Sequence, residues 1–277
     1  MNIDMKKRLL VVFLFLLPLT TLKAGEQKSL ELPRIQVVPI QDPNTGREYE
    51  LLIKLPGGYD KSGDKKHPVI YFTDAMWHVE ILSATVEYVI EDAILVGITW
   101  QKNLAAAKHE WSSRGRDLVP ALGKDSKGEA HKYLTFLRSE VIKYIESSYR
   151  ANPDNRTYFG YSVGGLFGAY TLLSQPDTFK NYIIGSPWFG PYLTSLFEPG
   201  SHKVSKDLLK QTNVFISHGA LEEKLSDKVA IFVSQLKSRK IANLSLESAV
   251  IESADHTTAF PKTSVRSIYW LADRLKP

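Results

Sequence analysis

The sequence predicts an α/β protein in which helices cover both faces of a mostly parallel sheet. Short apolar runs bounded by turn residues, such as residues 68–72 and 93–98, are typical of strands that are buried on both sides. Amphipathic helical patterns lie between these runs, and one of them spans residues 133–149. Strands that alternate with helices of this length favour parallel pairing.

The first 24 residues have the three-part pattern of a secretory signal peptide. Lys6, Lys7 and Arg8 form a basic start, an apolar run occupies residues 9–17, and small residues precede Gly25. The run is shorter than the roughly 20 residues that a membrane-spanning helix needs. We therefore predict a signal peptide over residues 1–24, a single mature domain over 25–277, and a periplasmic or secreted location.

The mature chain begins with two predicted antiparallel strands and continues as alternating strands and helices. The first two strands are residues 34–40 and 48–55, and a turn at 43–46 joins them. The further predicted strands are residues 68–72, 93–98, 158–161, 182–184, 214–216 and 244–251, and the predicted helices are 133–149, 165–173, 225–240 and 264–275. The polar, lysine-rich connection 101–128 is expected to form a mobile rim rather than a lid. No repeat or linker divides the mature chain.

Composition restricts the chemistry. The chain has no cysteine, which excludes disulfides, thiolate metal sites and a cysteine nucleophile. Its net charge of +5, from 35 basic and 30 acidic residues, is too small an excess to indicate nucleic-acid binding. No apolar run of membrane-spanning length follows residue 25, so we expect no membrane span in the mature chain. A small-molecule substrate is the expected partner.

Ser162 is the candidate nucleophile. It lies in Gly-Tyr-Ser-Val-Gly (residues 160–164), which follows a predicted strand and opens a predicted helix. A G-x-S-x-G sequence in that setting forms a strained turn that raises the serine hydroxyl above the sheet edge, and the glycines leave room for it. The first N–H groups of the helix then point toward developing negative charge. The alternative is a glycine-rich turn with an idle serine.

The candidate base is His256, because it follows the last predicted strand and precedes the last helix. On such a sheet the chain order is serine, acid, histidine. The acid should then follow the strand at 214–216, where Glu222 and Glu223 are both candidates. We favour Glu222, which lies nearer the strand end; the alternative is that both glutamates only stabilise a helix N-terminus. Two backbone N–H groups should stabilise an oxyanion, and Val163 and Met76 are the candidates by position.

Several blocks of the sequence resemble the α/β-hydrolase superfamily and, within it, the esterase family that contains siderophore trilactone esterases and S-formylglutathione hydrolases. The blocks lie between residues 34 and 275 and comprise residues 68–74, 114–120, 160–166, 186–188, Gly219 with Glu222, and Asp255 with His256. In the first block Ala75 replaces the family's glycine after Asp74. The resemblance implies that Ser162, Glu222 and His256 are nucleophile, orienting acid and base. It also implies that Met76 and Val163 are the oxyanion donors, and it requires no metal or organic cofactor.

Aromatic and basic residues are expected around this site. Trp77, Trp100, Trp111, Trp188 and Tyr192 fall in segments predicted as loops at the carboxyl edge of the sheet. Arg114 and Arg116 are candidates to pair with an anionic group of the substrate, or else form surface salt bridges. The sequence thus predicts an exported serine esterase acting on a siderophore lactone or another aryl or acyl ester. The alternatives are a binding protein without catalysis and an acyltransferase that uses the same residues.

Overall fold

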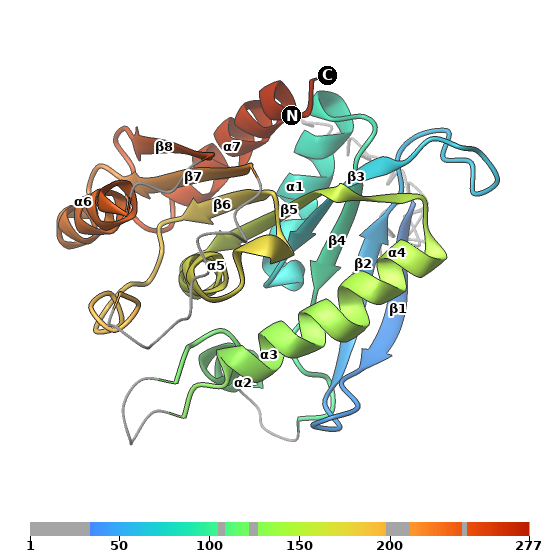
Figure 1. Cartoon of the computed structure of the whole chain (residues 1–277), viewed down its shortest axis with the longest axis horizontal. Coiled ribbons are helices and arrows are strands. Elements are labelled where there is room, and N and C mark those ends of the chain that lie inside the picture. Colours follow the sequence, from blue (N-terminus) through green and yellow to red (C-terminus); the bar gives the residue numbers. More distant parts are fainter. Residues whose placement is uncertain (1–33, 105–108, 122–126, 198–210, 240–242, 277) are drawn as a thin grey trace, which may run out of the picture. The chain divides into compact units, whose positions relative to one another are not determined.

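The predicted α/β architecture is confirmed by the computed structural model, which describes residues 34–104, 109–121, 127–197, 211–239 and 243–276 (Figure 1). The predicted signal peptide, residues 1–24, lies outside the described residues. Within the described part, no helix has the length and hydropathy to cross a bilayer.

A single eight-stranded sheet runs through the described chain. Its strands are β1 (Ile35–Gln41), β2 (Glu48–Lys54), β3 (His67–Phe72), β4 (Ile94–Ile98), β5 (Ala151–Tyr161), β6 (Asn181–Gly185), β7 (Thr212–Gly219) and β8 (Leu244–Ile251). They lie in the order β1-β2-β4-β3-β5-β6-β7-β8. Only the β1–β2 and β2–β4 pairs are antiparallel. Because the other neighbours are parallel, the carboxyl ends of β3 to β8 meet at one edge of the sheet.

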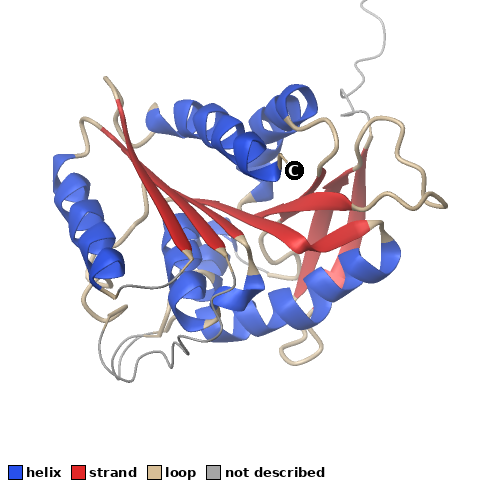
Figure 2. Cartoon of the chain, turned by 45° about the horizontal axis from the view of Figure 1, so that its top comes forward, coloured by secondary structure: helices blue, strands red, loops and turns tan. Residues whose placement is uncertain are grey.

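Helices cover both faces of this sheet, as Figure 2 shows. The α-helices are α1 (Ala75–Val89), α2 (His109–Asp117), α3 (Ala130–Phe136), α4 (Lys143–Ser148), α5 (Val163–Ser174), α6 (Glu223–Ser238) and α7 (Ala259–Leu275). A π-helical segment, η1 (Leu137–Ile142), joins α3 to α4, and a short 3₁₀ turn, η2 (Pro176–Thr178), follows α5. Helices α1 and α7 pack together on one face, whereas α3 to α6 contribute to the core on the other.

Each buried strand divides its side chains between these two faces. In β3, Val69 and Tyr71 join the core beneath α3 to α6, while Ile70 and Phe72 join the core beneath α1 and α7. All four are completely buried. This alternation explains why the strand appears in the sequence as a continuous apolar run.

Three predicted elements need correction. Strand β5 begins at Ala151, seven residues before the prediction, because its polar first half pairs with β3 although it carries no apolar pattern. Residues 75–89 form helix α1, which buries Val79, Leu82 and Val86 at helical spacing, so Met76 and Trp77 lie in a helical turn and not in a loop. The connection 101–128, in which no helix was predicted, contains α2.

Candidate active site

Ser162, His256 and Glu222 come from three separate strand-to-helix connections at the carboxyl edge of the sheet. Ser162 lies between β5 and α5, Glu222 between β7 and α6, and His256 between β8 and α7. The Nε2 atom of His256 is 3.0 Å from the Ser162 hydroxyl, and its Nδ1 atom is 2.6 Å from Glu222 Oε1. The sheet topology thus brings together three residues that are up to 94 positions apart.

Ser162 occupies a strained turn. Its backbone has φ 56° and ψ −116°, a conformation that side-chain-bearing residues rarely adopt. Its N–H donates to Gly185 O, and its carbonyl accepts from Leu166 and Trp188. A Cβ atom on Gly160 would lie 2.2 Å from Gly164 O, so glycine is required at Gly160. The turn is therefore held by backbone bonds and by a close approach that only glycine permits.

Glu222 is fixed through both carboxylate oxygens. While Oε1 faces His256, Oε2 accepts hydrogen bonds of 2.7 Å from Ser186 Oγ and from Gly219 N–H. Partial burial alone raises the pKa of Glu222, but these three donors outweigh it and hold the pKa below its ordinary value of 4.5. The carboxylate is consequently ionised at neutral pH and positioned to stabilise a protonated imidazole.

The loop that carries His256 is held at several points. Tyr161 donates from its hydroxyl to His256 O at 2.6 Å. Asp255 Oδ1 accepts from the backbone N–H groups of Thr257 and Thr258 at 3.0 and 2.8 Å. These bonds fix the backbone on both sides of the imidazole, whose ring is about half exposed at 48%.

Val163, the residue after Ser162, and Met76 are the two candidate oxyanion donors. Met76 N–H and Val163 N–H lie in the first turns of α1 and α5 and make no hydrogen bond within the described chain. The left-handed conformation required before α1 falls on Asp74 (φ 57°) and not on Ala75, so alanine is compatible with this position. A Cβ atom on Gly164 would lie 2.6 Å from the Thr73 hydroxyl, which shows how closely the β3–α1 connection approaches the serine turn.

A cavity of about 600 Å³ opens beside Ser162 and His256. Its wall contains the side chains of Trp77, Trp111 and Trp188, which are 45%, 58% and 45% exposed. Trp100 packs edge-on against Trp77 at 4.8 Å, and Tyr192 packs against Trp188 at 5.5 Å. A cavity of this size with aromatic walls suits an aryl or acyl group.

The two arginines predicted near the substrate have different surroundings. Arg114 lines the cavity, but its guanidinium is buried and binds both carboxylate oxygens of Asp74, at 2.6 and 3.1 Å. It also lies over the rings of Trp77 and Trp111, at 4.7 and 5.2 Å from their centroids. Arg116 does not line the cavity and instead binds Asp117 and Gln101. Their roles toward a substrate stay predictions.

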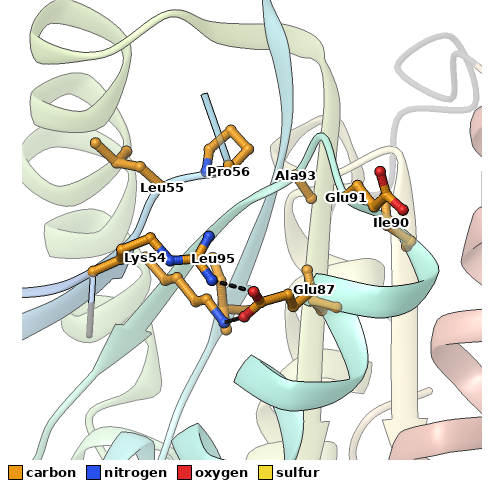
Figure 3. A pocket seen from close by; sticks show the side chains of 11 residues that line it. Lys54, Leu55, Pro56, Glu87, Ile90, Glu91, Ala93 and Leu95 are labelled. Carbon is orange, nitrogen blue, oxygen red and sulfur yellow. Dashed lines mark hydrogen bonds and ion pairs between the residues drawn. The ribbon is translucent and has the colours of Figure 1, made fainter. Parts of the chain in front are cut away.

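A second hollow lies between β2 and α1, where Figure 3 shows Lys54 and Glu87. Lys54 Nζ pairs with Glu87 at 2.5 Å and donates to the carbonyl and hydroxyl of Ser83 at 2.9 Å, and Arg34 pairs with the same glutamate. Glu87 thus pairs with two cationic side chains, and no serine, threonine or histidine of the described chain lines the hollow. Elsewhere in the described residues, no three His, Asp or Glu side chains cluster as metal ligands.

Three residues that contribute to the site were not predicted from the sequence. Ser186 binds Glu222, Tyr161 binds the His256 backbone, and His78 forms part of the cavity wall. Ser186 and Tyr161 lie inside the blocks 186–188 and 160–166, but the sequence carried no signal for their contacts. His78 fell in a segment whose helix was not predicted.

A mostly parallel sheet covered on both faces, with a serine turn at its carboxyl edge, defines the α/β-hydrolase type of fold. The chain belongs to the Esterase family, described as "Putative esterase", whose profile matches residues 43–263. Membership of this family identifies the chain as a hydrolase of esters.

The relatives of this chain include proteins that are named siderophore esterases. The chain is 26% identical over 224 residues to ferri-bacillibactin esterase BesA of Bacillus subtilis. This alignment covers 72% of this chain and 74% of BesA. The crystal structure of the BES protein from Bacillus cereus aligns with a TM-score of 0.75 at 23% identity, covering 90% of this chain and 98% of that one. Siderophore hydrolase EstB from Aspergillus nidulans also aligns with a TM-score of 0.75, at 17% identity, covering 91% and 99%. These structural likenesses concern the fold.

Proposed function

We propose that the protein is an exported serine esterase that cleaves a carboxylic ester through an acyl-enzyme formed on Ser162. The observation that carries this proposal is the continuous hydrogen-bonded series from Ser162 Oγ through His256 to Glu222, at 3.0 and 2.6 Å. A serine hydroxyl is a weak nucleophile until a neighbouring base accepts its proton, and this series supplies the base and the group that orients it.

In the first half of the reaction, Ser162 Oγ attacks the ester carbonyl while His256 Nε2 accepts the hydroxyl proton. The Glu222 carboxylate accepts a hydrogen bond from the protonated Nδ1 of His256 and stabilises the imidazolium that forms. The N–H groups of Met76 and Val163 donate to the oxyanion, a contribution that is worth about 3–4 kcal/mol per donor in comparable sites. His256 then protonates the leaving alkoxide, and the alcohol departs.

In the second half, water enters beside His256 and attacks the acyl carbon. His256 accepts a proton from the water and returns it to Ser162 Oγ as the acid leaves. The half-exposed imidazole is consistent with access for this water. If an alcohol takes the place of water the same residues perform acyl transfer, so product analysis in the presence of an added alcohol distinguishes the two outcomes.

The substrate class that we propose is an aryl or acyl ester, with a siderophore lactone as the leading candidate. The aromatic walls of the cavity support an aryl group, and the names of the relatives support a siderophore. Export, inferred from the signal pattern of residues 1–24, would place the enzyme where imported or secreted siderophores are found.

Hydrolysis of p-nitrophenyl acetate and butyrate tests the proposal. Wild type is expected to cleave both esters, and Ser162→Ala is expected to lose at least about a thousandfold in kcat, as loss of a nucleophile requires. A fluorophosphonate should label Ser162 in wild type. Equal rates for the two proteins, together with no labelling, would instead identify a binding protein without catalysis. A panel of esters that includes a ferric trilactone then defines the substrate.

A further inference from the structure

His78 is a buried histidine in the wall of the candidate substrate cavity. It belongs to the first turns of α1, is only 5% exposed, and lines the cavity that also contains Ser162 and His256. Its ring stacks on Phe260 at 4.4 Å and meets the edge of Phe159 at 6.2 Å. The reaction described above does not use it.

The hydrogen bond made by His78 fixes its tautomer. The Nδ1 atom lies 3.1 Å from the carbonyl oxygen of Thr73. Because a carbonyl can only accept, Nδ1 must carry a proton. Burial lowers the pKa of His78 to about 4, so the ring holds no second proton at neutral pH. Its Nε2 atom is therefore a hydrogen-bond acceptor with a free lone pair.

The Nε2 atom has no hydrogen-bond partner within the described chain, yet the protein does not enclose it completely. Among the described residues, the only hydrogen bond of this side chain is the one from Nδ1. Nδ1 of His218 is fully enclosed without a partner, whereas Nε2 of His78 is not fully enclosed. His78 also lines the cavity that contains Ser162 and His256. Buried acceptors normally have a donor, which the protein, water or a ligand can supply.

We propose that His78 binds the substrate, and that Nε2 accepts a hydrogen bond from a hydroxyl or N–H group on the aromatic moiety that fills the cavity. The inference rests on the proposed esterase function and narrows its substrate class. An acceptor at Nε2 of His78 favours aryl esters that carry a hydrogen-bond donor over esters of the same shape that carry none. A buried acceptor in a largely aromatic wall discriminates in this way, because a substrate without the donor leaves the acceptor unpaired.

Two matched pairs of p-nitrophenyl esters test the proposal on wild type. One pair is the 3-hydroxybenzoate and the 3-methylbenzoate, and the other is the indole-5-carboxylate and the benzofuran-5-carboxylate. For each pair, the ratio of the two kcat/KM values is divided by the ratio of the two rates of hydrolysis by hydroxide, which corrects for the intrinsic reactivity of the esters. The corrected ratio is expected to favour the donor-bearing ester by about tenfold in at least one pair. The pair that responds shows whether the donor is a hydroxyl or an N–H. Ratios near one in both pairs overturn the proposal.

The variant His78→Phe separates binding from a structural role. Phenylalanine fills the same space without an acceptor, so the preference ratio should fall to about one. If His78 only supports the fold, both esters of a pair slow by the same factor and the ratio persists, which contradicts the proposal. Should His78→Phe not fold, as judged by circular dichroism, His78→Asn replaces it. Asparagine can still donate to Thr73 but is too short to present the second acceptor, so the ratio should again fall to about one.

Binding measurements keep this proposal distinct from the esterase proposal. The affinity of Ser162→Ala for 3-hydroxybenzamide and 3-methylbenzamide can be followed by the fluorescence of the cavity tryptophans. A preference for the hydroxyl ligand of about tenfold that disappears in the double variant with His78→Phe supports the role of His78, even if wild type cleaves no ester. Equal affinities in Ser162→Ala contradict it, even if wild type is an active esterase.

Discussion

Ser186 Oγ lies 2.7 Å from Glu222 Oε2, the oxygen that does not face His256. Ser186 follows β6 in a positive-φ conformation (34°), and its own N–H donates to Ser217 O. Its hydroxyl and the Gly219 N–H together fix one carboxylate oxygen, which leaves the other aimed at the imidazole. Ser186, at the end of β6, thus helps to orient the Glu222 carboxylate toward His256.

Removing this hydroxyl should slow the chemical step. In Ser186→Ala, Glu222 keeps only one of its two fixing donors, so kcat should fall about tenfold with little change in KM, as expected for loss of a hydrogen bond to a charged group. Steady-state kinetics with p-nitrophenyl butyrate measures this. Ser217→Ala is the matched control, because Ser217 Oγ binds Thr263 and does not contact Glu222. Equal effects of the two substitutions would argue against a positioning role for Ser186.

The two adjacent glutamates should differ sharply. Glu222→Gln cannot stabilise the imidazolium, so kcat should fall at least about a thousandfold. Glu223 begins α6 and is exposed, so Glu223→Gln should leave kcat within about twofold of wild type and cost at most about 1 kcal/mol of stability through the helix dipole. Both variants can be assayed with p-nitrophenyl butyrate. A larger loss in Glu223→Gln than in Glu222→Gln would reverse the assignment.

The sequence predicted the sheet better than its connections. The buried strand β3 carries a continuous apolar pattern, and the edge strand β8 was predicted with its observed bounds. The serine turn was predictable because its geometry demands glycine at Gly160. By contrast, α1 starts with exposed Met76 and Trp77 at the cavity, which obscured its helical pattern. Contacts such as that of Ser186 with Glu222 depend on sheet register, which local patterns do not encode.

His78 should make stability depend on pH. Its pKa is about 4 in the folded protein and about 6.5 in an unfolded chain, so between these values the unfolded state binds more protons. Stability is therefore full above pH 6.5 and declines as the pH falls toward 4. Urea unfolding should show that wild type loses about 2 kcal/mol more than His78→Gln between pH 7 and pH 5. The exposed His131, changed to Gln, serves as the control and should leave this pH dependence unchanged.

The buried ion pair of Arg114 and Asp74 should be essential for stability. Both side chains are almost fully enclosed, at 4% and 0% exposure, and they join α2 to the connection between β3 and α1. Arg114→Met preserves length and packing against Trp77. Among the described residues, it leaves the buried Asp74 carboxylate with only the Trp100 indole N–H as a side-chain donor. Breaking a buried pair from one side typically costs about 3–5 kcal/mol.

The exposed pair of Arg138 and Asp177, at 35% and 39% exposure, provides the comparison. Arg138→Met should cost at most about 1 kcal/mol, because water screens that pair. Chemical denaturation of both variants gives the two free energies of unfolding. Because Asp74 precedes the candidate oxyanion donor Met76, Arg114→Met should also lower kcat, whereas Arg138→Met should not. Similar unfolding free energies for the two variants would mean that the buried pair contributes no more than a surface contact.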